Sequence, residues 1–391
     1  MYKQKIVIVG GGIVGLSTAY ALLKQGMKQV TVLEQAAIDH KRSTSHGISR
    51  LLRFEYGNDA FYSDLVQQSS KRWRTLARLT RQTLYTPTEL LVLGHEGDQF
   101  TQPSYTNLRR MGLPIEYVSR HECKHYFPQF NLQGYDQFTY NHEAGILHAS
   151  NCLRTLKGLI TDLGGTICEG KRIHDITYDT TRFPVRLHCD DGETLTADRV
   201  VLALGPWVHT LLGELALPVR PTRQYLLYFG NLASKDFDIH TFPAFLSEDL
   251  YGFPLHSSFD SAGPRWLKVA SHAFGNTINP DDEPQVEERV IAQIRKRIVD
   301  LLPAVRHATL ERVDTCMYDV TPDEDFILDY HPHNAHIIFA SGLTGHGFKF
   351  GPLLGEILSS LVRDAPPPVP TTRFQLARFA EHRRLQQESV A

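Results

Sequence analysis

Three glycines near the start of the chain have the spacing of a dinucleotide-binding turn. Gly10, Gly12 and Gly15 form the pattern G-x-G-x-x-G directly after a β-branched run. Such glycines allow a tight bend, a close approach of the main chain to a pyrophosphate, and close helix–strand contact. Glu34 follows 19 residues after Gly15, where an acidic side chain can bind a ribose hydroxyl. These residue types predict a dinucleotide site, although three glycines alone are also typical of an ordinary turn in an α/β sheet.

The elements around the glycines must place them at the edge of a sheet. Lys5 to Val9 is a short β-branched run and predicts a buried parallel strand. Helical spacing begins at Ile13 and ends at Gly26, and Val30 to Leu33 predicts a second strand. The start of the helix would direct unpaired N–H groups and a partial positive charge at the phosphates. Because strand, glycines, helix, strand and acid occur in this order, the dinucleotide interpretation is favoured.

The composition excludes several other classes of protein. A chain of 391 residues is long enough for two domains. The net charge of −2 leaves no excess of basic residues for nucleic acid, and no apolar stretch is long enough to span a membrane. The five cysteines form no C-x-x-C pair and are odd in number. We therefore expect no disulfide framework, no metal site, no signal peptide and a cytoplasmic protein.

Later strand-like segments divide between two sheets. Asp198 to Leu204 and Asn334 to Phe339 read as buried strands that return to the first sheet. The segment from Ala365 is proline-rich and then basic, and we expect it to be helical and to lie on the surface. The expected nucleotide-binding domain is discontinuous, and it comprises residues 1–84, 149–221 and 323–391. The expected second domain comprises residues 85–148 and 222–322.

Five basic side chains have a spacing that could serve chemistry. If Arg50 and Arg53 lie on a helical turn, both guanidinium groups project from the same face of that turn. Two nearby arginines, however, usually form a solvated patch. Alternation along a strand from Trp266 places Lys268 and His272 on one face, which could equally be the solvent side. Lys349 lies in a loop with four glycines, which could approach a flat ring closely.

Five blocks occur in an order that carries a resemblance. They are SHGISRLLRFEYG (45–57), YGFP (251–254), WLKVASH (266–272), CMYDVTPDEDFILD (316–329) and SGLTGHGFKFG (341–351). Together with the glycine motif they resemble the monomeric sarcosine oxidase and N-methyltryptophan oxidase family, within the glycine/D-amino-acid-oxidase class of flavoproteins. The resemblance covers all but about the last ten residues, and its C-M-Y-x-x-T-P-D block is far more specific than the glycine pattern.

The resemblance implies a fold and an activity. The fold would be α/β, with a Rossmann-like FAD-binding domain and a mainly antiparallel substrate domain, as in p-hydroxybenzoate hydroxylase. The activity would be oxidation of secondary amino acids, either N-methyl or cyclic. Two electrons and a proton would leave the C–N unit as a hydride equivalent, O₂ would become hydrogen peroxide, and the imine would hydrolyse. The partners would be a small amino acid and O₂, and the protein would act as a monomer.

The resemblance also assigns roles to residues. Arg53 and Lys349 would bind the substrate carboxylate, and Lys268 would activate oxygen. Cys316 would attach the flavin covalently, for which a cysteine must be able to become a thiolate; most free cysteines are instead small buried hydrophobes. The remaining catalytic candidates, beside the flavin or substrate, are Arg50, His272, Tyr251 and Tyr318. The cofactor-binding candidates, besides the glycine motif and Glu34, are Ser49, Gly205, His346 and Gly347.

The chain also departs from the family pattern. Where the family tends to have R-H-A-Y-G, this chain has R-F-E-Y-G at residues 53–57, followed by Asn58. The sequence therefore does not identify the side chain of the amino-acid substrate. One alternative is an oxidase or dehydrogenase of pipecolate, proline or a secondary-metabolite imine, and another is a non-catalytic flavin-binding module. Arg53, Lys268 and Lys349 disfavour the module, because binding alone requires none of them. The C-terminal residues form no peroxisomal signal.

Overall fold

The first strand, β1 (Lys5–Val9), lies inside a six-stranded sheet. The computed structural model describes residues 4–179, 184–257 and 263–380. The strand order is β19-β20-β13-β1-β2-β9, and only β19 and β20 are antiparallel. The other strands are β2 (Gln29–Glu34), β9 (Thr166–Glu169), β13 (Arg199–Leu202), β19 (Ile327–His331) and β20 (Asn334–Ser341). This sheet confirms the α/β class.

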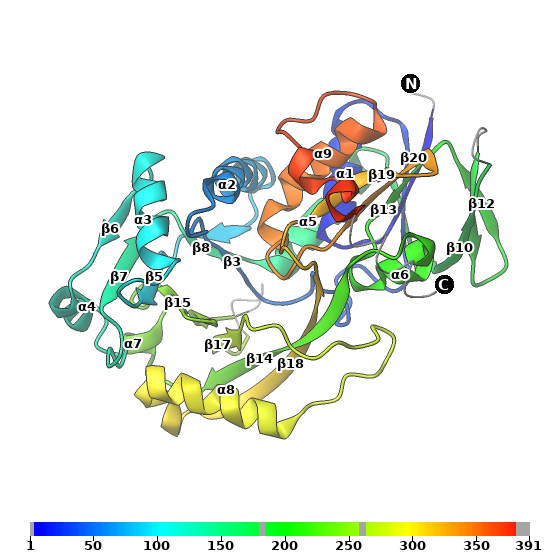
Figure 1. Ribbon diagram of the computed structural model, residues 1–391. Helices are drawn as coiled ribbons and strands as arrows, with labels where there is room; N and C mark the ends of the chain where they lie inside the picture. The colour runs from blue at the N-terminus through cyan, green and yellow to red at the C-terminus, as the bar shows by residue number, and fades with distance from the viewer. Residues whose placement is uncertain (1–3, 180–183, 258–262, 381–391) are drawn as a thin grey trace.

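Both faces of this sheet are covered, which explains why its strands are apolar throughout. Ile6 and Ile8 of β1 face the helices, whereas Val7 and Val9 belong to a different core on the opposite face. The helices are α1 (Ile13–Lys24), α5 (Ala149–Asp162) and α9 (Gly351–Val362). The opposite face carries β10 (Ile173–Thr177), β11 (Val185–Cys189), β12 (Thr194–Ala197) and α6 (Val208–Leu212), seen at the right of Figure 1.

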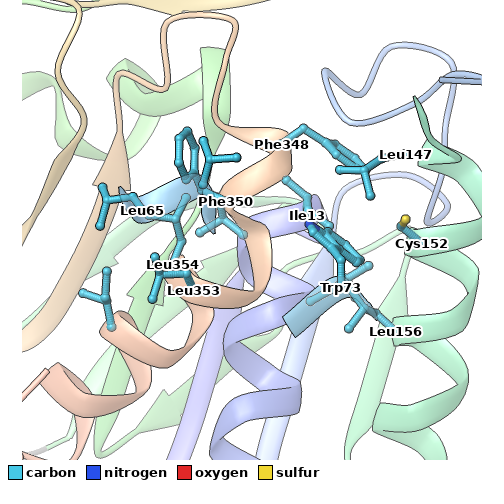
Figure 2. Packing of buried hydrophobic residues seen from close by; sticks show 14 of the residues in the cluster. Ile13, Leu65, Trp73, Leu147, Cys152, Leu156, Phe348, Phe350, Leu353 and Leu354 are labelled. Atoms are coloured by element: carbon cyan, nitrogen blue, oxygen red, sulfur yellow. The ribbon is translucent and has the colours of Figure 1, made fainter. Parts of the chain in front are cut away.

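A packed cluster fixes the segment that carries Lys349. Trp73 on α2 (Ala60–Thr80) stacks on Phe348 with ring centroids 6.2 Å apart. Figure 2 shows both residues in one apolar cluster with Ile13 and Leu147. The Trp73 indole N–H donates to the Lys349 carbonyl at 2.8 Å, and the Ser69 hydroxyl donates to the same carbonyl at 2.6 Å. Two side chains of α2 therefore fix the main chain at Lys349.

The second sheet has eight strands in the order β18-β14-β17-β16-β15-β5-β7-β6, and all its neighbours are antiparallel except β15 and β5. Leu227 and Phe229 on one face share a core with residues of α8 (Glu288–Leu301), a helix that lies against this sheet in Figure 1. Leu226 and Tyr228 on the other face belong to a cluster with Cys316. The strands are β5 (Leu90–Gly94), β6 (Ile115–Tyr117), β7 (Gln137–Asn141), β14 (Arg220–Gly230), β15 (Ala244–Ser247), β16 (Leu250–His256), β17 (Trp266–Ser271) and β18 (Thr309–Val320).

A small three-stranded sheet carries Arg50, and its first strand ends one residue before Arg53. It contains β3 (Arg50–Leu52), β8 (Gly145–Leu147) and β4 (Tyr85–Thr86), with Arg50 opposite Leu147. The helical-turn hypothesis for this segment is wrong, because its main chain pairs with β8. The remaining helices are α3 (Thr101–Arg110), α4 (Arg120–Tyr126) and α7 (Ser234–Phe237).

The C-terminal segment differs from its expectation. Up to residue 380 it forms short 3₁₀ turns, at Thr372–Phe374 and Leu376–Phe379, rather than a surface helix. The Phe374 side chain is fully buried and packs on Phe326, with ring centroids 5.6 Å apart. Apolar burial explains this docking. The basic end of the expected helix, residues 381–391, lies outside the described residues. Within the described ranges, no helix is long and apolar enough to cross a membrane.

Candidate active site

A long cavity runs from the glycine turn to the basic residues of the other blocks. One end is lined by Gly10, Gly12 and Glu34, and the other end by Arg53 and Lys349. Further wall residues are Ser45, Arg50, Gly205, Tyr251, His272, Cys316, Tyr318, Asp319, His346 and Gly347. The structure thus brings nearly all the sequence-predicted residues to one cavity. Gly15, Ser49 and Lys268 lie behind its wall.

The glycine end leaves no room for side chains. A Cβ on Gly15 would lie 1.9 Å from the Gly10 carbonyl oxygen, and Gly10 itself has φ +108°. Glu34 at the end of β2 accepts from the Gly11 N–H at 2.7 Å. The Ser45 hydroxyl accepts from the Ile13 N–H at 3.0 Å, in the first turn of α1. Sequence analysis missed Ser45, because no local pattern links it to a helix 32 residues away.

Arg50 is held by main-chain carbonyl groups. Its guanidinium donates to the carbonyl oxygens of Ser49 at 2.8 Å, Thr44 at 2.7 Å and His46 at 2.6 Å. No carboxylate pairs with it among the described residues. The guanidinium therefore shapes the 44–49 loop and keeps its positive charge beside the cavity.

Lys268 is buried, so the solvent-face alternative for its strand is wrong. Its side chain is 1 % exposed, and its ammonium donates to the Ser49 carbonyl at 2.8 Å and to the Ser49 hydroxyl at 3.3 Å. The ammonium also lies 5.1 Å from the centre of the Phe253 ring. Burial, followed by the charge of Arg50, holds the pKa of Lys268 well below its usual range.

Cys316 lies on β18 with its sulfur facing two main-chain carbonyl groups. The Sγ is 3.8 Å from the Thr44 oxygen and 3.7 Å from the Met317 oxygen. Burial raises the pKa of the thiol, and the charges of Arg50 and Lys268 act in the opposite direction. All five cysteines of the chain are unpaired. The geometry therefore presents a reduced thiol with two cations nearby that would stabilise its thiolate.

Arg53 and Lys349 converge on one aromatic ring. The Arg53 guanidinium carbon is 4.5 Å from the centre of the Tyr56 ring, and the Lys349 nitrogen is 5.1 Å from it. Lys349 is 4 % exposed. Neither side chain has an ion pair with a carboxylate in the described part of the chain. Burial, and then the charge of Arg53, hold the pKa of Lys349 well below its usual range. Two such cations in one cavity form an anion-binding site.

The wall beside this cationic clamp (Arg53 and Lys349) is neutral and aromatic. The His272 ring lies 6.3 Å from the Tyr251 ring and 5.8 Å from the Tyr318 ring. Burial, followed by the charges of the clamp, lowers the pKa of His272 to about 4. Burial also raises the pKa values of Tyr251 and Tyr318, whose side chains share a hydrogen bond. All three groups are therefore uncharged at neutral pH.

His346 is also neutral. Its Nδ1 lies 3.0 Å from the Tyr56 hydroxyl and its Nε2 3.2 Å from the Glu324 carbonyl oxygen. Burial holds the pKa of the imidazole well below its usual range. With a proton on Nε2, the ring donates to Glu324 and accepts from Tyr56. The neighbouring Gly345 has no space for a Cβ, which would lie 2.3 Å from the Tyr318 ring.

Two further residues of the site escaped sequence analysis. The Tyr56 ring makes a cation–π contact with each cation of the clamp. Glu55, noted only as a departure from a family pattern, is fully buried, and its carbonyl oxygen accepts from Arg53. Hydrophobic patterning could not have found Glu55, because a carboxylate between two aromatic residues normally indicates a solvent-facing position.

The residues present fit an FAD molecule. The glycine end admits main chain only, the cavity is continuous up to the clamp, and Gly205, with φ +53°, opens its wall at a strand end. A dinucleotide turn that leads to buried cations and a neutral imidazole defines a flavin-dependent oxidoreductase.

Comparison with known proteins gives the family. The chain belongs to the DAO family of FAD-dependent oxidoreductases, whose profile matches residues 5–361. It is 32% identical over 381 residues to peroxisomal sarcosine oxidase of Mus musculus, covering 96% of each chain. It is 30% identical to monomeric sarcosine oxidase of a Bacillus species, covering 98% of each. It is 28% identical to N-methyl-L-tryptophan oxidase of Yersinia pestis, covering 96% of this chain and 99% of that one.

The fold agrees with solved structures. Glycine oxidase from Geobacillus kaustophilus superposes with a TM-score of 0.81 at 20% identity, over 96% of this chain and 98% of that one. The expected arrangement of an FAD-binding unit and a second, mainly antiparallel sheet is therefore confirmed.

Proposed function

We propose that the protein is an FAD-dependent oxidase of secondary amino acids, either N-methylated or cyclic. The observation that carries this proposal is the clamp of Arg53 and Lys349. A carboxylate is the anion that matches the clamp, because a guanidinium and an ammonium can each donate to one of its oxygens.

The rest of the cavity suits the neutral amine of such a substrate. Tyr251, Tyr318 and His272 carry no charge at neutral pH, so these three groups neither repel the carboxylate nor compete with it for the clamp. Lys349 is buried and Arg53 is half-buried, and partial removal from water strengthens each charge–charge interaction. No side chain of the cavity stands out as a strong base, in keeping with oxidation of an amine that has already lost its proton.

FAD supplies the two-electron acceptor when it is bound. The chain's own residues would hold it: the glycine turn with Glu34 at one end, Cys316 as the point of covalent attachment, and Arg50 in the wall, with Ser49 behind it. Lys268 places a buried ammonium next to Ser49, where a positive charge would stabilise negative charge developing on oxygen. His346 and Gly347 complete the wall at the clamp.

We also propose O₂ as the electron acceptor, a monomeric protein and a cytoplasmic location. The five unpaired cysteines support a reducing compartment. The domain division 1–84, 149–221 and 323–391 against 85–148 and 222–322 belongs to the same proposal. It is supported by the membership of the strands in two separate large sheets.

The test is a substrate screen on the holoenzyme. Sarcosine, N-methyl-L-amino acids, L-proline and L-pipecolate are each added anaerobically, and bleaching of the flavin absorbance is recorded. Air is then admitted and peroxide is measured. We expect bleaching and peroxide with at least one secondary amino acid and with no matched primary amine that lacks a carboxylate. A holoenzyme that none of these compounds bleaches would contradict the proposal and favour a non-catalytic module. Bleaching without peroxide would instead indicate a dehydrogenase.

A further inference from the structure

Asp319 is a buried carboxylate that lines the cavity and has a free oxygen. The residue is 2 % exposed and follows Cys316 and Tyr318 on β18. Its Oδ2 has no hydrogen-bond partner among the described residues, and no ion pair involves Asp319 there. An ionised carboxylate can only accept hydrogen bonds. The wall of the cavity therefore holds an acceptor that lacks a donor from the chain itself.

Asp319 is ionised at neutral and alkaline pH. Burial raises its pKa to about 6, and hydrogen bonds from the main chain at Leu343 and Gly342 act in the opposite direction. A ligand that covered the free oxygen without offering a donor would leave an unpaired buried charge, which is unfavourable. A ligand of this cavity should therefore present a hydroxyl or an N–H group to Asp319.

Asp319 lies at the edge of the six-stranded sheet that also carries the glycine turn. Its main-chain carbonyl accepts from the Thr344 N–H at 3.0 Å, just past the end of β20. Because β1, β13 and β20 are parallel neighbours, their carboxyl ends meet at one edge. Gly10 after β1, Gly205 after β13 and Leu343 after β20 all line the cavity. The cavity thus runs along this edge from the glycine turn to Asp319.

The order of groups along this edge indicates which part of FAD reaches Asp319. β20 is two strands from β1, or about 10 Å at the usual spacing, so Asp319 is away from the pyrophosphate at the glycine turn. Glu34, the expected partner of the adenine ribose, ends β2 on the other side of β1. Cys316, the proposed attachment point of the ring, precedes Asp319 on the same strand. The ribityl chain joins the pyrophosphate to the ring, and its hydroxyls are hydrogen-bond donors.

We propose that Asp319 is a further cofactor-binding residue, whose free carboxylate oxygen accepts a hydrogen bond from a ribityl hydroxyl of FAD. The contact fixes the chain between the pyrophosphate and the ring, and it thereby limits the positions that the ring can take. Sequence analysis assigned this residue no role. The inference does not depend on the proposed substrate, because it concerns the cofactor alone.

The experiment compares FAD with an analogue whose ribityl chain carries no hydroxyls. Both are bound to the enzyme in a Cys316→Ser background, which keeps the flavin exchangeable whether or not the wild type attaches it. Flavin fluorescence on dilution of each holoenzyme at pH 8 gives Kd with Asp319 present and in Asp319→Ala. We expect Asp319→Ala to weaken FAD binding roughly 10- to 150-fold, the range for a hydrogen bond to a charged group. The analogue should bind to the variant no more weakly, because it has no hydroxyl to lose.

Two further variants separate this contact from damage to the fold. Asp319→Asn keeps an acceptor oxygen without its charge, so its loss of FAD affinity should be smaller than that of Asp319→Ala. It has nearly the same shape as the parent and carries the test if the alanine variant does not fold. Asp323→Asn removes a half-exposed carboxylate that pairs with Arg378 at 2.7 Å, and it should bind both cofactors like the parent.

Two results would overturn the proposal. Equal losses with FAD and with the analogue would mean that Asp319 acts on another part of FAD, such as the ring imide, or only on the fold. Unchanged FAD affinity in both Asp319 variants would mean that water satisfies the carboxylate. Either result would leave the proposed substrate class standing, because neither measurement involves the clamp.

Discussion

The ammonium of Lys268 and the guanidinium of Arg50 donate to the same main-chain oxygen, that of Ser49, each at 2.8 Å. A buried and a half-buried cation thus share one neutral acceptor, and neither has a carboxylate partner in the described part of the chain. This arrangement keeps positive charge beside the cavity wall without neutralising it. It also explains why the charge of Arg50 lowers the pKa of Lys268.

Replacement of Lys268 by methionine should slow the reaction of the reduced enzyme with O₂. Loss of one preorganised cation is expected to cost about 10²–10³-fold in rate. Reduction by the amino acid should suffer less, because the carboxylate is bound elsewhere. Stopped-flow absorbance separates the two half-reactions, and Lys268→Arg is the charge-retaining control. Because the ammonium is charged only below its lowered pKa, the wild-type rate with O₂ should fall as pH rises through that value. An unchanged rate in Lys268→Met would exclude this role.

Replacement of Cys316 by serine should abolish covalent attachment of the flavin. In the wild type, a fluorescent flavin band should remain with the polypeptide on a denaturing gel. Attachment to the apoprotein should accelerate as pH rises, because burial raises the pKa of the thiol and the thiolate is the reactive form. Cys168→Ser changes another unpaired, partly buried cysteine and should leave the band intact. Release of all wild-type flavin by acid precipitation would show that no attachment exists.

Replacement of Arg53 by alanine should weaken binding of (methylthio)acetate. Truncation of one partner of a buried charge pair costs roughly 2–5 kcal/mol, or about 30- to 5,000-fold in affinity. The measurement is a titration of the oxidised holoenzyme at pH 7. Arg109→Ala, which changes an exposed arginine on α3, should bind like the wild type. An unchanged dissociation constant in Arg53→Ala would place the carboxylate elsewhere.

Replacement of Phe374 by alanine should destabilise the protein. Its ring is fully buried against Phe326 and Phe61, and a buried Phe→Ala change costs about 3–5 kcal/mol in free energy of unfolding. Urea denaturation of the holoenzyme measures the loss. Leu79→Ala, at a leucine that is 61% exposed, should change stability by less than about 0.5 kcal/mol. Equal stability of the two variants would mean that the C-terminal segment does not support the fold.

The nucleotide end of the site could be predicted almost completely from the sequence. The run from Lys5 to Glu34 contains its own strand, turn and helix signals, and its β1–β2 pairing joins neighbouring segments of the chain. The substrate end could not be predicted in the same way. Alternation placed Lys268 and His272 on one face of a strand, but only packing against the 44–50 segment decides that this face is buried. The strand at Arg50 depends on pairing with Leu147, about a hundred residues away.

Glu55 and Phe374 show a second limit. A carboxylate is buried here because Asn141, at the end of another strand, donates to it, and no spacing in the sequence reveals that partner. The proline-rich segment before Phe374 is typical of a surface position, yet Phe374 itself packs against Phe326 in the interior. In both places tertiary contacts override the local signal.

The strand order of the six-stranded sheet has a consequence for how the chain is made. Ile6 of β1 pairs with Arg199 of β13, and Val200 of β13 pairs with Ile337 of β20. A ribosome that adds about 5–20 residues per second therefore releases β1 roughly ten to forty seconds before its β13 neighbour exists. The glycine turn emerges first, but the Lys349 segment and α9, which cover the same site, emerge last. FAD should thus be captured only after synthesis is nearly complete, by a chain whose apolar β1 has remained without its β13 neighbour and open to aggregation.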